Sequence, residues 1–234
     1  MGLLVRTWNL FHGNADPPRR RGFLRTMVEL ASADDPDVLC LQELPVWALR
    51  RLESWCGMQV FPAVTRRPMT SRPVSRWVTR SHQGLFRSGL TGQANAILVH
   101  GSRAAVGLGS AQISEPGREV RLVSCVRMAG LVIANLHATN DFRNPTVTRA
   151  EASRAAAFAE GHARPDEPVV LAGDFNITDP GLEAYSQPGP GIDHVLVRGA
   201  DAGPLDVWPV TRRMQNGVVL SDHPPVELRV RMAR

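Results

Sequence analysis

Residues 169–176 read Val-Val-Leu-Ala-Gly-Asp-Phe-Asn, a short apolar run that ends in a glycine, an acid and an amide. Such a run predicts a buried β-strand, and Gly173 indicates a tight turn at its end. A carboxylate beside a buried strand, here Asp174, costs free energy unless it is paired or binds a cation. This segment therefore predicts a strand of a layered α/β fold with a candidate functional residue at its end.

The same arrangement, a short apolar run beside a polar residue, recurs along the 234 residues. Runs rich in Val, Ile and Leu predict strands at 3–8, 37–42, 94–99, 120–127, 130–136, 168–173, 192–197 and 225–231. Helical periodicity is strong only at 22–33, 46–54 and 146–160, the last with Asn144 as N-cap, Pro145 at the first helical position and Gly161 just past the end. No linker or repeat divides the chain, so we expect one α/β domain over 1–234.

The polar residues beside these strands include acids, amides and imidazoles. They are Asn9, Glu43, His137, Asp174, Asn176, Asp193, Asp222 and His223. Each alone has a structural explanation, such as a turn cap, a helix start or a core histidine. Their recurrence at strand ends favours a common site, because layered α/β folds gather their functional groups there.

Charge is distributed unevenly along a chain of net charge +5 in which all 27 basic residues are arginine. No acid occurs between Glu53 and Glu115, whereas seven arginines do: Arg66, Arg67, Arg72, Arg76, Arg80, Arg87 and Arg103. This segment is a candidate anion-binding surface, although a solvated segment shaped by coding bias would have the same composition. Within it, residues 65–92 contain several prolines and glycines and are predicted to form a long Arg-rich loop.

The three cysteines, Cys40, Cys56 and Cys125, lack CxxC or metal-ligand spacing and lie in apolar surroundings, so we expect reduced core thiols. The first residues enter a predicted strand without a signal-peptide pattern. No 18-residue apolar stretch indicates a membrane span. We therefore expect a cytoplasmic protein, and nothing in the sequence indicates an obligate protein partner.

Seven short motifs resemble the successive signatures of the endonuclease/exonuclease/phosphatase superfamily, which has the DNase I-like fold. They are Trp8-Asn9, Leu41-Gln42-Glu43, Gly92-Gln93-Ala94-Asn95-Ala96-Ile97-Leu98, Asn135-Leu136-His137, Gly173-Asp174-Phe175-Asn176, Ile192-Asp193-His194 and Ser221-Asp222-His223. The resemblance extends from residue 4 to about residue 228. It implies a four-layer α/β/β/α sandwich of two mostly antiparallel sheets and a metal-dependent attack of water on a phosphate ester.

The resemblance also implies roles for the carboxylates and amides. Glu43 would be the principal ligand of a hard divalent cation, Mg²⁺ or Mn²⁺, with Asn9 and Asp222 near it directly or through water. Oxygen ligands without a thiolate argue against zinc. Asp174 would orient or deprotonate the attacking water, and Asn176 would donate its amide to the developing negative charge.

Four histidines are placed by the same resemblance. His223 would face the phosphoryl group while Asp193 accepts its other ring N–H, and His137 would be a second donor. Asn140 is a candidate contact for a phosphate oxygen. His12 is an optional phosphate contact, and His194 is expected to face away from Asp193.

Two features depart from known members of the superfamily. In DNase I-type members a glutamate supports the histidine that corresponds to His137, yet residues 54–114 contain no acid. The residues before Asp193 read Pro-Gly-Pro-Gly-Ile, without the Trp-Arg of abasic-site nucleases, which argues against that activity.

Three functions remain open from the sequence. The first is a nuclease, in which Arg72 and Arg76 track phosphates while Trp77 and Phe86 stack on bases. The second is a phosphatase or phosphodiesterase acting on a small-molecule or lipid headgroup phosphate. The third is a catalytically inactive binding protein. An inactive member would be expected to have lost some of the catalytic residues, whereas this chain has Glu43, Asp174 and His223.

Overall fold

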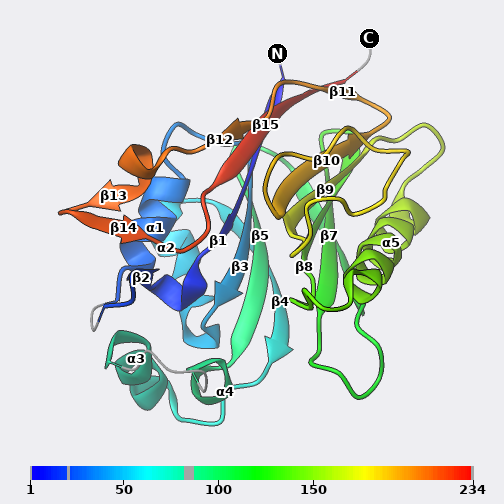
Figure 1. Cartoon of the computed structure of the whole chain (residues 1–234). Coiled ribbons are helices and arrows are strands. Elements are labelled where there is room, and N and C mark those ends of the chain that lie inside the picture. The colour runs from blue at the N-terminus through cyan, green and yellow to red at the C-terminus, as the bar shows by residue number, and fades with distance from the viewer. Residues whose placement is uncertain (1, 20–21, 82–86, 233–234) are drawn as a thin grey trace.

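Two β-sheets pack face to face at the centre of the molecule, with helices on the outer face of each (Figure 1). The computed structural model describes residues 2–19, 22–81 and 87–232. Within these residues the chain forms the α/β/β/α sandwich that the sequence predicts.

The first sheet contains seven strands among the described residues, in the order β11-β15-β1-β3-β5-β4, with β12 also paired to β15. Their bounds are β1 Leu3–Asn9, β3 Val38–Leu44, β4 Gln59–Arg66, β5 Gln93–Val99, β11 Asp201–Ala202, β12 Asp206–Val207 and β15 Val226–Arg231. The pairs are antiparallel except β1 with β3, which run parallel.

The second sheet has the order β10-β9-β8-β7-β6 and likewise contains a parallel pair, β8 with β9. Its strands are β6 Ala105–Gln112, β7 Leu122–Met128, β8 Leu131–His137, β9 Val169–Asp174 and β10 Asp193–Arg198. A small third sheet joins β2 Ala15–Asp16, β14 Val218–Leu220 and β13 Met214–Gln215.

The helices complete the outer layers. They are α1 Leu24–Ala31, α2 Leu52–Cys56, α3 Arg72–Ser81, α4 Arg87–Thr91 and α5 Pro145–His162, with short 3₁₀ helices η1 Phe11–Gly13, η2 Val46–Ala48 and η3 Val210–Arg213. Figure 1 shows α1 and α2 beside the first sheet, α5 beside the second, and α3 with α4 below the ends of the first sheet's strands.

Apolar side chains fill three interfaces between these layers. One cluster joins α1 and α2 to the first sheet, through residues such as Met27 and Leu41. A second lies between the two sheets, with Val5 and Ile133 from opposite sides. A third packs α5 on the second sheet through a row of alanines that includes Ala152 and Ala155. The small alanine side chains let the helix approach the sheet closely.

The parallel pairs determine where the polar strand ends meet. Because β1 and β3 run parallel, their carboxyl ends lie side by side, with Asn9 opposite Gln42. In the other sheet His137 lies opposite Asp174 at the ends of β8 and β9. We call the edge formed by these four strand ends the carboxyl rim. The antiparallel strands β5, β10 and β15 begin at the same edge, so residues preceding or opening them also reach it.

A buried amide bridge ties the two sheets together just below the carboxyl rim. The side chain of Gln42 in β3 donates to Oδ1 of Asn135 in β8 at 2.8 Å, and Asn135 donates to the carbonyl oxygens of Leu41 and Ala96 at 3.0 Å. Both amides are fully buried. Shifting one sheet against the other would leave these groups without partners, which costs about 1–3 kcal/mol for each.

The structure corrects part of the sequence interpretation. Residues 65–92 are not a continuous loop, because they include the end of β4 and the helices α3 and α4. Pro73 occupies the second position of α3, where a missing N–H is tolerated, so it begins the helix rather than preventing it. Gly161 lies inside α5, which ends at His162, while Asn144 and Pro145 occupy the predicted positions at its start.

No helix in the described part of the chain is long and apolar enough to cross a membrane. Cys40 and Cys125 are buried core thiols as predicted, whereas Cys56 is half-buried.

Candidate active site

Glu43 projects from a bulge in β3. Leu41 pairs with Ala96 and Leu44 with Ala94, so β3 contains one residue more than β5 between these pairs. Glu43 adopts a φ of 53°, a conformation that costs a non-glycine residue about 1–3 kcal/mol. Bulges redirect side chains next to functional sites. The Glu43 side chain here remains 22% exposed at the carboxyl rim, next to side chains from β1, β8 and β9.

Asp174 is the most enclosed acid of the cluster, with a side chain only 1% exposed. Asn9 donates to its Oδ2 at 2.9 Å, and the backbone N–H of Asn176 donates to Oδ1 at 2.9 Å. Both oxygens are therefore held in place. Burial, together with the negative charge of Asp193, raises the pKa of Asp174 to about 7.

His223 and Asp193 form a hydrogen-bonded pair on the other side of Asp174. His223 Nδ1 donates to Asp193 Oδ2 at 2.7 Å, and His223 Nε2 lies 3.9 Å from Asp174 Oδ2. Burial opposes the charge on His223, but the hydrogen bond and the charge of Asp193, with those of Asp174 and Asp222, raise its pKa to about 10. The imidazolium is thus favoured, with Nε2–H facing the site.

His137 has neighbours that the sequence interpretation missed. Gln93 Nε2 lies 3.4 Å from His137 Nδ1, and Arg121 Nη1 lies 3.2 Å from both ring nitrogens. Gln93 opens β5 at the carboxyl rim, and Arg121 precedes β7 and pairs with Glu119 at 3.0 Å. Burial and the charge of Arg121 hold the pKa of His137 well below its ordinary value.

These contacts settle which protonation state of His137 the surroundings favour. Arg121 is equally distant from both ring nitrogens, but the amide of Gln93 donates to Nδ1 alone, so a neutral ring carries its proton on Nε2. That atom lies 3.5 Å from Asp174 Oδ2 and 3.9 Å from Glu43 Oε1. The described partners of His137 on this side are thus an amide and an arginine, and not an acid. The motif that contains Gln93 was visible in the sequence, but its contact with His137 was not.

The donor set fits a hard divalent cation. Burial raises the pKa of Glu43, and the charge of Asp222 adds to this effect against the hydrogen bond from Asn9. A cation between these carboxylates would relieve the repulsion, and carboxylate oxygens are the ligands that Mg²⁺ prefers. Asn9 takes a different position from the one expected of an oxygen ligand. Its amide nitrogen links Asp174 and Glu43, at 2.9 and 3.4 Å, while its oxygen accepts the N–H of Phe11.

A second group of ligand atoms lies close together. Asp174, Asp193 and His223 each offer one atom within 4.8 Å of the others. His223 uses Nδ1 for Asp193, so only its Nε2 could ligate a metal, and the raised pKa of His223 favours a protonated ring and a hydrogen-bonded relay in the absence of a cation.

The remaining predicted residues are distributed around this cluster. Asn176 donates its side chain to the carbonyl oxygen of Ala138 at 2.9 Å, below the site. His12 is buried, with Nε2 3.9 Å from Glu43 Oε2. Asn140 is exposed just beyond β8. His194 lies outside the cluster, as predicted, and bonds the carbonyl oxygen of Ile177 at 2.8 Å.

Arg72 and Arg76 are not among the residues that the structure brings together at the carboxyl rim. Both are exposed on α3, and no described contact links either one to the acidic cluster. Arg76 instead lies against Trp47, with its guanidinium carbon 5.4 Å from the ring centroid.

The same cluster contains several residues with strained backbone. Four of its non-glycine residues have φ between 52° and 59°: His12, Glu43, Asn176 and Ser221. Ser221 was not singled out from the sequence, yet its hydroxyl donates to the carbonyl oxygen of Asn9 at 2.6 Å and accepts the N–H of His223 at 3.1 Å. It therefore fixes the segment before β15 against the end of β1. Strained residues held in this way are typical of functional sites.

Comparison with known proteins agrees with this geometry. The sequence model described as "Endonuclease/Exonuclease/phosphatase family" matches residues 7–223. No curated protein matches the sequence.

Several solved structures share the fold. A mannosyl-6-phosphatase of Bacteroides thetaiotaomicron superposes with a TM-score of 0.69 and 16% identity, over 98% of this chain and 100% of that one. A humanized D. rerio TDP2 gives 0.67 and 17%, over 98% and 99%. The human Nocturnin catalytic domain with bound sulfate gives 0.65 and 14%, over 99% and 94%. At these identities the likeness concerns the DNase I-like fold alone, whereas the sequence match covers both ends of the site, from β1 to His223. The chain belongs to the endonuclease/exonuclease/phosphatase family.

Proposed function

We propose that this protein is a nuclease that uses a divalent cation to hydrolyse phosphodiester bonds of DNA or RNA. One observation supports hydrolysis as the reaction: five side chains converge at the carboxyl rim. They are Glu43, Asp174, His137 and the hydrogen-bonded pair of His223 and Asp193. Hydrolysis of a phosphate ester requires an activated water and donors for the charge that develops on the phosphoryl oxygens.

The protein's own groups divide these tasks. Asp174, held through both oxygens, would orient the attacking water and take its proton. His223 would donate from Nε2 to a phosphoryl oxygen, because Asp193 holds its ring and its charge. His137 would donate from Nε2 to a second oxygen, with the amide of Gln93 at Nδ1 favouring this tautomer. Glu43, with Asp222 beside it, would hold Mg²⁺ or Mn²⁺, which supplies Lewis-acid stabilisation of the phosphoryl group when bound.

The choice of nucleic acid rests on the surface around α3. Arg72, Arg76 and Arg80 are exposed there, and the side chain of Trp77 between them is 63% exposed. Guanidinium groups bind backbone phosphates in pairs of hydrogen bonds, and an exposed indole can stack on a base. Figure 1 shows α3 below the β-strand ends that form the carboxyl rim. A nucleic-acid strand bound along α3 would therefore lead away from the site.

A second function, hydrolysis of a small-molecule or lipid headgroup phosphate, is favoured by a separate observation. A cavity of about 560 Å³ is lined by Thr65, Arg66, Ser88, Arg118, Glu119 and Val120. It adjoins the His137 side of the site, because Arg66 lies opposite Gln93 in the β4–β5 ladder and Val120 precedes Arg121. Gln93 and Arg121 are the two residues that contact His137. A compact phosphate ester between Arg66 and Arg118 would fit this space.

One panel separates the two functions. Purified protein with Mg²⁺ or Mn²⁺ is given supercoiled plasmid, single-stranded RNA, a chromogenic phosphodiester and an inositol phosphate, each with and without EDTA. We expect EDTA-sensitive cleavage of plasmid or RNA. Hydrolysis of the inositol phosphate without cleavage of either nucleic acid would favour the second function, and activity unaffected by EDTA would contradict the metal-dependent mechanism.

Glu43→Gln tests the mechanism itself. We expect turnover to fall by about 10²-fold or more, with partial recovery at high Mg²⁺, because one charged ligand is lost while the other groups remain. Glu183→Gln is the matched control, because Glu183 is exposed and lies outside the cluster. Equal turnover by the two variants would remove Glu43 from the mechanism.

A further inference from the structure

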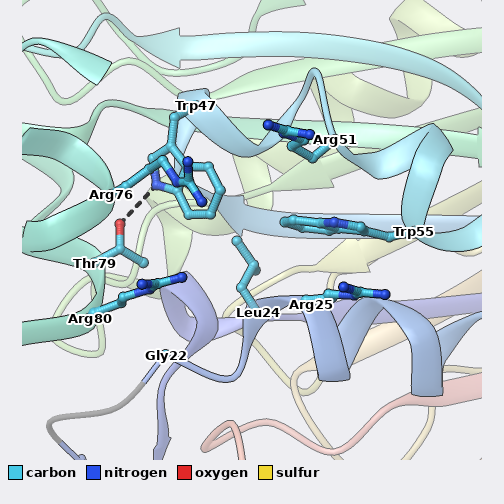
Figure 2. Close-up of a pocket in the computed structure, with 9 residues that line it drawn as sticks. All are labelled: Gly22, Leu24, Arg25, Trp47, Arg51, Trp55, Arg76, Thr79 and Arg80. Atoms are coloured by element: carbon cyan, nitrogen blue, oxygen red, sulfur yellow. Dashed lines mark hydrogen bonds between the residues drawn. The ribbon is translucent and has the colours of Figure 1, made fainter. Parts of the chain in front are cut away.

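A cavity distinct from the catalytic cluster lies between α1, the η2–α2 segment and α3. It encloses about 290 Å³ and is lined by Gly22, Leu24, Arg25, Trp47, Arg51, Trp55, Arg76, Thr79 and Arg80 (Figure 2). Four of these residues are arginines, two are tryptophans, and none is an acid. The volume is close to the lower end of the range for small-molecule sites.

The two indole rings of the cavity, Trp47 and Trp55, lie nearly perpendicular to each other and form a corner. The ring centroids of Trp47 and Trp55 are 6.1 Å apart and their planes meet at 76°. Both side chains are half-buried, and Trp47 is fixed by a hydrogen bond from Nε1 to Thr79 Oγ1 at 2.9 Å. A flat ring stacked on one indole would therefore meet the edge of the other, an arrangement that aromatic groups favour.

The arginines around this corner are available for an anion. Among the described residues, no carboxylate lies within ion-pair distance of Arg51, Arg76 or Arg80, whereas Arg25 pairs with Glu29 at 2.7 Å. In the view of Figure 2 the guanidinium groups of Arg25 and Arg51 flank the Trp55 ring, and those of Arg76 and Arg80 lie on the Trp47 side. Unneutralised arginines gathered on one cavity repel each other, and an anion bound between them removes that repulsion.

Structural contacts within the described part of the chain account for Arg25, which pairs with Glu29, and for Arg76, which lies against Trp47, but not for Arg51 and Arg80. The arginines that stabilise the fold elsewhere are paired with acids, as Arg6 is with Glu227 and Arg127 with Glu167. The cavity arginines come from three separate segments, α1, the residue just before α2, and α3, and contribute no ion pair between those segments among the described residues. Their common feature is the cavity that they face.

We propose that this cavity binds a nucleotide, with the base stacked against Trp55 or Trp47 and the phosphate held by Arg51 and Arg80. The nucleotide could be free or could belong to a nucleic-acid strand, and the chemistry of recognition is the same for both. The proposal does not depend on which ester the catalytic site hydrolyses.

Binding is measured by isothermal titration calorimetry on the full chain in EDTA, so that hydrolysis does not interfere. The probes are ADP, adenosine and inorganic pyrophosphate. We expect ADP to bind at least about 10-fold more tightly than adenosine or pyrophosphate, because it alone offers both a base and phosphates. Pyrophosphate binding as tightly as ADP, or an ADP Kd weaker than about 1 mM, would overturn the proposal.

Variants assign the binding to this cavity. Arg51→Gln/Arg80→Gln should weaken ADP binding by about 10-fold or more, and Arg149→Gln/Arg164→Gln, which removes the same charge at and just after α5, should change it by less than about 2-fold. Trp55→Leu should weaken ADP but not pyrophosphate, as expected from the loss of stacking. Because Trp55 also packs on the core, circular dichroism must first show that this variant is folded. ADP affinity unchanged in the Arg51/Arg80 variant would overturn the proposal even if the Trp55 variant does not fold.

A final arm identifies the source of the nucleotide. Fluorescence anisotropy with a labelled six-nucleotide single-stranded DNA, in EDTA, is compared with ADP titration. Binding of the oligonucleotide that ADP displaces, and that the Arg51/Arg80 variant weakens, assigns the cavity to a strand. Binding of ADP alone, with the same sensitivity to the variant, assigns it to a free nucleotide.

Discussion

Gly173 gives the sharpest test of how the catalytic groups are positioned. Its φ is +147°, and a Cβ atom added there would lie 2.0 Å from the carbonyl oxygen of Leu136, its partner in the parallel ladder between β8 and β9. Real Cβ atoms do not approach other heavy atoms closer than 3.0 Å, so the two strands must separate locally by about 1 Å. Asp174 and His137 are the next residues along each strand.

The cost of Gly173→Ala has two parts. A non-glycine residue in this region of φ costs about 1–3 kcal/mol, and forcing a methyl group against packed backbone costs about 1–3 kcal/mol more. We therefore expect the free energy of unfolding to fall by about 4 kcal/mol, a large share of the 5–15 kcal/mol typical of a domain. The variant should remain folded at low temperature, with turnover lowered by about 10²-fold because a 1 Å displacement misplaces the reacting groups.

Gly109→Ala separates the two parts. Gly109 has a φ of +102°, but an added Cβ would meet nothing within 4 Å, so this variant introduces backbone strain without a clash. Urea unfolding followed by circular dichroism should give a loss of about 1–3 kcal/mol for Gly109→Ala and a clearly larger loss for Gly173→Ala. Equal losses for the two variants would refute the argument from the contact with Leu136.

Three further predictions follow from other contacts. Asp193→Asn should lower turnover on a chromogenic phosphodiester by roughly 10²–10⁴-fold, because His223 loses the carboxylate that holds its charge, and wild-type turnover would contradict this. Burial opposes ionisation of Glu167, but hydrogen bonds from Arg127 hold its pKa below the ordinary value. The pair therefore stabilises the fold fully above about pH 4.3, the ordinary pKa of a glutamate. This stabilisation is lost as the pH falls through the lower pKa that Glu167 has in the folded protein. Urea unfolding should thus show Glu167→Gln to be less stable than wild type at pH 7, with a smaller difference at pH 3, and an unchanged difference would refute the assignment. Burial raises the pKa of all three thiols, that of Cys125 to about 12, but Cys56 alone is half-buried rather than buried. Ellman's reagent at pH 8 should therefore modify Cys56 first and the other two only after unfolding.

The sequence predicts the central strands well and the edge strands poorly. β1, β3, β5, β7, β8, β9, β10 and β15 correspond to the eight predicted runs, because they are buried and therefore almost continuously apolar. β4 and β6 end the two sheets in the strand order, and most of their side chains are at least partly exposed. Pro62 in β4 and the glycines of β6 further weaken their patterns.

The site was predictable to the extent that it lies at strand ends. Glu43, His137 and Asp174 meet at the carboxyl rim because they lie where parallel strands end, and Asp193 and His223 join them because β10 and β15 begin at the same edge. The neighbours of His137 were not predictable, because Gln93 and Arg121 reach it from strands whose pairing is set by the tertiary fold. The position of α3 was also missed, because its buried face consists of Ser75, Val78 and Thr79 and so contains little apolar sequence to reveal it.

The amide bridge between Gln42 and Asn135 bears on how this scaffold can be altered. It fastens the two sheets one residue before Glu43 and two residues before His137, so the spacing of the catalytic groups is set from beneath them. Helices α3 and α4, between β4 and β5, contribute no described contact to the catalytic cluster, unlike the segment before β15, which carries Ser221 and His223. Exchanging α3 and α4 should therefore change which esters are admitted while preserving hydrolysis of a minimal phosphodiester. We expect recognition and chemistry to be separable at this part of the chain.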